Sequence, residues 1–131
     1  MTTDLDIMNI GVGSDARRLT ITNVTFKTVT VAEDKTAEKI YLECVFPDSS
    51  HAITISETWC NKDGKYIILG LWISLDMNKQ LLKGSALGTL LAYLGADKIG
   101  DLIGKEAIGY PDKNGYTIIS NFKVEDPKKL V

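Results

Sequence analysis

One helical stripe interrupts a chain whose other periodic segments alternate in the manner of β-strands. Four leucines have the i, i+3, i+4, i+7 spacing of a single helix face, namely Leu87, Leu90, Leu91 and Leu94. Ser85 stands where an N-cap is expected, and Gly95 stands where the helix should end. The sequence therefore predicts one short helix within a mainly β protein.

The segments before this helix carry the period-two alternation of strands. Within 18–31 the alternation changes phase after Ile21 and again after Phe26, and each change predicts a β-bulge that bends a long strand. The polar stretch 32–39 is expected to be a connection. Further antiparallel strands are predicted, with turns at 47–50 and at Asp63-Gly64, over 39–46, 51–59 and 65–75.

The segments after the helix predict a short apolar turn and a closing hairpin. Ile99, Leu102 and Ile103 form the turn, which is expected to end at Gly104. Two strands are then expected, at 105–110 and 116–122, because Asn-Gly between them is a strong hairpin signal.

This order of elements favours a small OB-like Greek-key β-barrel with one helix before the final hairpin, in which the helix plugs the barrel. The sequence predicts one strand more than the five of an OB-fold, because 51–59 and 65–75 both have the pattern of strands. The surplus is either a hairpin extension of the third strand or the sign of an α+β fold, an antiparallel sheet covered by one helix. We expect a flexible leader over 1–16, a single OB-like domain over 17–123 and a flexible tail over 124–131.

Composition limits the classes of function. The chain has 131 residues, 44% of them hydrophobic, and a formal net charge of −2, which suits one domain with one core. Contact with a polyanion therefore needs a local basic patch. Cys44, Cys60 and His51 are the only cysteines and histidine, too few for a zinc site, and no neighbours in sequence complete a catalytic set. We expect no metal, no cofactor and no enzymatic activity.

The termini and apolar runs bear on location. The acidic N-terminus lacks the positive charge and apolar run of a secretory signal peptide. The longest apolar run, 66–75, is about half of the roughly 20 residues that a membrane helix needs. We expect a cytoplasmic protein with no membrane contact.

The last third of the chain suggests a family. The stretch "GSALGTLLAYLG", followed by "IGDLIGKEAIGY" and "NGYTII", resembles the C-terminal part of small OB-fold proteins of phages and archaeal viruses, including single-stranded-DNA-binding proteins. In such proteins a Ser-Leu-Gly-x-Leu-Leu helix ends in Leu-Gly, and Leu-Ile-Gly-Lys opens the next strand. The resemblance covers roughly residues 84–120. It implies the barrel fold, binding of single-stranded DNA and, for a viral protein, a place in the host cytoplasm.

Aromatic residues opposite the apolar rows are the candidate binding residues. If the rows 40–46 and 67–75 face inward, Tyr41, Tyr66 and Trp72 face outward, where bases of any identity can stack. Lysines that can meet phosphates flank these positions or lie in the first and last hairpin loops: Lys39, Lys62, Lys65, Lys35 and Lys113. The leading prediction is binding of single-stranded nucleic acid, foremost DNA, with little sequence preference.

A protein-interaction or assembly module, such as a viral accessory protein that forms a homodimer, is the alternative. The slightly acidic balance and the apolar positions Ile68 and Trp72 favour it. In that case the outward aromatics pack in a core or a dimer interface instead of meeting bases.

Overall fold

The computed structural model describes residues 16–47, 49–112 and 114–125. Most of the predicted leader, most of the predicted tail and Lys113 lie outside these residues. The described elements are β1 (Arg17–Ala32), β2 (Lys35–Val45), β3 (Ala52–Ile55), β4 (Glu57–Lys62), β5 (Lys65–Gly70), α1 (Ala86–Leu94), the 3₁₀ turn η2 (Ile99–Leu102), β6 (Glu106–Pro111) and β7 (Thr117–Ser120).

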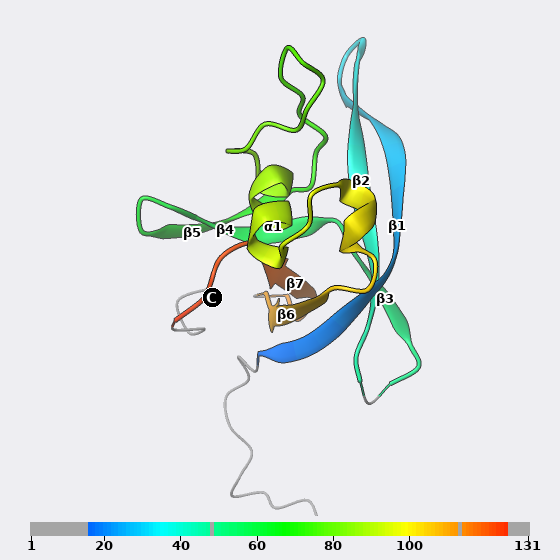
Figure 1. The fold of residues 1–131 in the computed structure, drawn as a ribbon, viewed down its shortest axis with the longest axis vertical. Coiled ribbons are helices and arrows are strands. Elements are labelled where there is room, and N and C mark those ends of the chain that lie inside the picture. The colour runs from blue at the N-terminus through cyan, green and yellow to red at the C-terminus, as the bar shows by residue number, and fades with distance from the viewer. Residues whose placement is uncertain (1–15, 48, 113, 126–131) are drawn as a thin grey trace, which may run out of the picture.

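The strands form one sheet in the order β3-β2-β1-β6-β7-β4-β5 (Figure 1). β4 and β7 run parallel, and the other neighbours are antiparallel. β3 and β4 are consecutive pieces of one segment interrupted only at Ser56, so the piece that pairs with β2 continues into the piece that pairs with β7. The sheet thus closes on itself as a small OB-like Greek-key barrel. β5 is a hairpin extension added to β4, which accounts for the surplus strand.

The long first strand is bent where the sequence predicts its first bulge. The pairing of β1 with β2 shifts register between Ile21 and Asn23. Here the amide of Ile21 donates to the carbonyl of Lys105 at 2.9 Å, and the amide of Gly104 donates back to the carbonyl of Ile21 at 2.7 Å. β1 therefore pairs with β6 before the bend and mainly with β2 after it, which is how one strand serves both sides of the barrel.

The second predicted bulge, after Phe26, is wrong. Pairing runs without a shift from Asn23 to Thr30, so Phe26 stays on the inner face of the hairpin, where it is 62% exposed. The predicted connection 32–39 is also too long, since β2 begins at Lys35. The β1–β2 hairpin projects beyond the barrel (Figure 1). The projecting part of the hairpin does not pack on the core, so neither face is required to be apolar. The alternation of apolar and polar residues there no longer indicates which way each side chain points.

Two other predicted strands have different bounds in the structure. The segment 51–59 is divided at Ser56 and its second piece continues to Lys62, whereas 65–75 leaves the β4–β5 hairpin after Gly70. The amide of Leu71 donates to the carbonyl of Ser56 at 2.9 Å, which draws the chain back toward β2.

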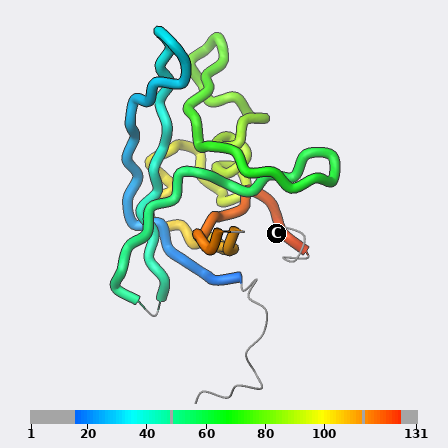
Figure 2. The backbone as a smooth tube through the Cα atoms, turned by 180° about the vertical axis from the view of Figure 1, so that it is seen from behind, coloured from blue at the N-terminus to red at the C-terminus, as the bar shows by residue number. Residues whose placement is uncertain are grey.

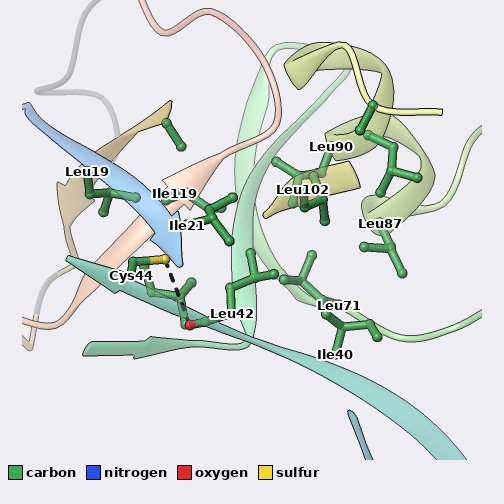
Figure 3. Close-up of a cluster of buried hydrophobic side chains, with 14 of the residues drawn as sticks. Leu19, Ile21, Ile40, Leu42, Cys44, Leu71, Leu87, Leu90, Leu102 and Ile119 are labelled. Atoms are coloured by element: carbon green, nitrogen blue, oxygen red, sulfur yellow. Dashed lines mark hydrogen bonds between the residues drawn. The ribbon is translucent and has the colours of Figure 1, made fainter. Parts of the chain in front are cut away.

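The helix is confirmed as predicted and closes the core. The Oγ of Ser85 accepts a hydrogen bond from the amide of Gly88 at 3.0 Å, and Gly95 ends the helix with a φ of 74°. Leu87 and Leu90 are fully buried and lie among side chains of the barrel strands (Figure 3). A second, smaller apolar cluster contains Trp59, Tyr110 and Ile118.

Candidate nucleic-acid interface

The segment 71–73 extends the outer face of the sheet beside β2. The amide of Ile40 donates to the carbonyl of Leu71, and the amide of Ile73 donates to the carbonyl of Glu38, both at 2.9 Å. This bridge places Trp72 directly opposite Lys39. The segment after β5 returns past the β1–β2 hairpin, as seen from the front in Figure 1 and from behind in Figure 2. Ile40 and Leu71 are buried in the core, so Lys39 and Trp72 lie on the opposite, outer face.

Trp72 is held against the sheet by its neighbours. The Nζ of Lys39 lies 5.0 Å from the centroid of the Trp72 ring. The indole occupies the space beside Gly70, where a Cβ atom would come within 2.5 Å of the Trp72 Nε1 atom and 3.1 Å of the Lys39 Cε atom. A residue without a side chain at position 70 therefore allows the indole to lie where it does.

Tyr41 lies on the same outer face, two residues along β2 from Lys39. The Nζ of Lys27 lies 4.9 Å from the centroid of the Tyr41 ring. Lys27 is also the direct cross-strand partner of Lys39, so two ammonium-bearing side chains stand side by side. We call this set, Lys27, Lys39, Tyr41 and Trp72, the aromatic–lysine face.

Among the described residues, the two lysines of the aromatic–lysine face have no carboxylate partner. Between described residues, the ion pair in the structure joins Arg18 and Glu106 at 3.8 Å, away from this face. Like charges placed directly opposite each other destabilise a sheet, and a cation over an exposed ring recovers only about 0.5–1 kcal/mol. A bound anion would therefore reduce the electrostatic repulsion between these two cations. Glu43, two residues beyond Tyr41 on β2, is the nearest acidic residue along that row of the strand.

The remaining predicted site residues lie elsewhere. Tyr66 stacks on Phe122 with a centroid separation of 5.2 Å and packs against the second cluster, which is the packing alternative for the outward aromatics, and it does not join the aromatic–lysine face. Lys62 and Lys65 face each other at the end of the β4–β5 hairpin, whose Asp63-Gly64 turn has two positive φ angles as predicted. Lys35 is exposed at the β1–β2 turn.

Lys27 is the member of the aromatic–lysine face that the sequence reasoning missed. Its position opposite Lys39 depends on the register of the β1–β2 hairpin, and the wrongly placed second bulge obscured that register. The signal present in the sequence was the unbroken alternation from Asn23 to Lys27, which would have grouped Thr25 and Lys27 with the outward row of β2.

The residues considered for catalysis are dispersed. Burial, with a smaller contribution from Glu43, raises the pKa of Cys44 to about 12, and burial raises the pKa of Cys60. Both thiols are therefore protonated at neutral pH, a form that is a poor nucleophile. His51 is exposed before β3, where its amide donates to the Ser49 Oγ at 3.1 Å. No cluster of three or more potential metal ligands occurs among the described residues.

Two open depressions lie away from the aromatic–lysine face. One, of about 380 Å³, lies between α1 and β6 and is lined by Tyr93, Leu94 and the Arg18–Glu106 pair. The other, of about 810 Å³, lies between α1 and the loop 75–83. Neither gathers aromatic rings and unpaired cations as the aromatic–lysine face does.

No family model, curated protein or solved structure matches the chain. Within the described residues, no helix is both long and apolar enough to cross a membrane.

Proposed function

We propose that this protein is a non-enzymatic binder of single-stranded nucleic acid, foremost DNA, that acts through the aromatic–lysine face. One observation carries the proposal: two lysines that have no carboxylate partner in the described part of the chain stand opposite each other, and each lies over the ring of an aromatic residue. Rings accept bases of any identity, and ammonium groups accept phosphates. The resemblance of residues 84–120 to single-stranded-DNA-binding OB-fold proteins of phages and archaeal viruses supports the same function.

Equilibrium binding of a fluorescently labelled oligothymidine, followed by anisotropy over a range of salt concentrations, tests the proposal. The wild-type protein should bind at low salt, and affinity should fall as salt rises. Each lysine that meets a phosphate contributes a slope of about 0.7 in log affinity against log salt. Lys39→Gln should reduce the slope, and Trp72→Leu should weaken binding at every salt concentration.

A matched control separates the face from general positive charge. Lys83, an exposed lysine on the loop between β5 and α1, lies outside the aromatic–lysine face, so Lys83→Gln should leave binding unchanged. The proposal is rejected if the wild-type protein does not bind at low salt, or if Lys39→Gln and Trp72→Leu bind as well as Lys83→Gln.

We propose self-association as the second candidate function, because a different surface favours it. The loop 75–82 exposes Leu75, Leu82 and Met77, and Met77 is fully exposed. A tight turn holds this loop: the Oδ1 of Asp76 accepts hydrogen bonds from the amides of Asn78 and Gln80 at 2.8 and 3.0 Å. Apolar side chains displayed on an ordered loop are typical of a protein contact.

Light scattering after size-exclusion chromatography tests self-association over a range of protein concentrations. A dimer in the wild-type protein that becomes a monomer in Met77→Lys would support it. A wild-type protein that stays monomeric at every concentration would reject it.

A further inference from the structure

One face of the Tyr41 ring and one face of the Trp72 ring are occupied before any ligand arrives. Lys27 lies over one ring and Lys39 over the other, at 4.9 and 5.0 Å from the centroids. A base that stacks on either covered face must therefore take the place of an ammonium group. The two events, arrival of a base and departure of a lysine, are coupled on each ring.

The free energies of the two contacts favour exchange of the ammonium group for a base. A cation over an exposed aromatic ring contributes less than a base stacked on that ring, because only the base brings a large apolar surface to the contact. A displaced ammonium group also gains a new partner, since a phosphate oxygen forms a charge-assisted hydrogen bond with it. Lys27 and Lys39 are opposite each other and have no carboxylate partner among the described residues, so one phosphate between them would contact both.

The spacing of the rings limits the conformation of the strand. Trp72 pairs with Lys39, and Tyr41 lies two residues along β2, so the two aromatic residues are diagonal cross-strand neighbours. Diagonal neighbours lie about 7–8 Å apart. Successive bases along one strand of B-DNA are only about 3.4 Å apart. Two successive bases that each cover one ring therefore cannot stay stacked on each other.

We infer that the aromatic–lysine face binds one unstacked dinucleotide step, with the bases replacing the two lysines on Tyr41 and Trp72 and the lysines moving to the phosphate that links the bases. This inference rests on the proposed function and specifies its ligand. It makes the face selective for single strands, because the bases of a duplex are already covered on both sides by their neighbours.

Two 12-residue probes of equal charge test the inference: oligothymidine and a fully abasic deoxyribose-phosphate chain. Stacking should make the wild-type protein prefer oligothymidine, by about 5- to 160-fold for each stacked base. Tyr41→Leu and Trp72→Leu should each remove one base's share of this preference. Lys27→Gln and Lys39→Gln should weaken binding of both probes by the same factor and leave the preference in place.

The results that would contradict this inference differ from those that would contradict the proposed function. Tyr93→Leu removes an exposed aromatic ring on α1, outside the face, and should leave the preference unchanged. Circular dichroism checks that each variant is folded. Equal binding of the two probes by the wild-type protein would overturn the inference while nucleic-acid binding stands, and unchanged binding of the abasic probe by Lys27→Gln would overturn the phosphate contact. Failure to bind either probe would instead reject the proposed function.

Discussion

Replacing Gly70 with alanine adds a methyl group next to the indole of Trp72. The new Cβ atom would lie 2.5 Å from Nε1 of Trp72 and 3.1 Å from Cε of Lys39. Real Cβ atoms essentially never approach another heavy atom so closely, so the indole must move by about 1 Å or more to restore ordinary contact distances of about 3.5–4.0 Å. The φ angle of Gly70 is not in the left-handed region, so alanine causes no backbone strain of that kind.

The Gly70→Ala substitution should therefore affect ligand binding more than folding. The atoms that must move belong to a half-exposed side chain and a flexible lysine, which can shift at small cost. Alanine also restricts the unfolded chain, which stabilises the fold by about 0.4–1 kcal/mol and offsets part of that cost. Displacing Trp72 removes one stacked base, so affinity for oligothymidine should fall by about 5-fold or more.

Anisotropy titration with labelled oligothymidine measures the loss, and thermal denaturation measures stability in the same samples. Gly84→Ala is the matched control, because a Cβ atom at position 84 would meet no atom within 4 Å. Wild-type affinity in Gly70→Ala, together with unchanged tryptophan emission, would refute the argument that Gly70 positions the indole. A large fall in melting temperature would refute the argument that the contact is mainly functional.

Other predictions concern the core, a thiol and the edge of the site. Leu87→Ala should lower the free energy of unfolding by about 3–5 kcal/mol in denaturant titration, because Leu87 is fully buried, whereas Leu82→Ala, at an exposed position, should change it by about 0.5 kcal/mol or less. The pKa of Cys44 rises from 9.0 to about 12 on folding, so this thiol contributes stability that is complete below pH 9 and is lost as the pH rises toward 12. Denaturation at pH 8 and pH 11 should show that loss, and Cys44→Ala should lack this contribution to it. Glu43→Gln should increase affinity for oligothymidine by about 1.5- to 5-fold at low salt, and an unchanged affinity would mean that Glu43 lies outside the electrostatic reach of the ligand.

Short-range features of this fold were predictable because neighbouring residues in the chain determine them. The spacing of Leu87, Leu90 and Leu91 and the caps at Ser85 and Gly95 define α1 without reference to the rest of the molecule. The Asp63-Gly64 turn depends on backbone preferences of two residues. The bulge after Ile21 was visible because the core selects apolar residues on both sides of it.

The candidate site was only partly predictable, since it is assembled from three separate segments. Tyr41 and Trp72 were identified from local alternation and Lys39 as a flanking lysine, and the structure brings the three together. Tyr66 was placed with them because 65–75 read as one strand. The turn away from the hairpin after Gly70 separates Tyr66 from Trp72, and that turn depends on the carbonyl of Ser56, which accepts a hydrogen bond from the amide of Leu71.

The sequence by itself determined the mainly β class, the single helix and the closing hairpin, because periodicity, caps and turn residues act over a few positions. Only the tertiary structure decided that the surplus strand extends β4, that the sheet closes, and that Lys27 and Lys39 meet beside two aromatic rings. These outcomes depend on which strand edges pair and in what register. Register on the projecting β1–β2 hairpin is set by cross-strand hydrogen bonds rather than by burial, so the hydrophobic pattern there carries little information about it.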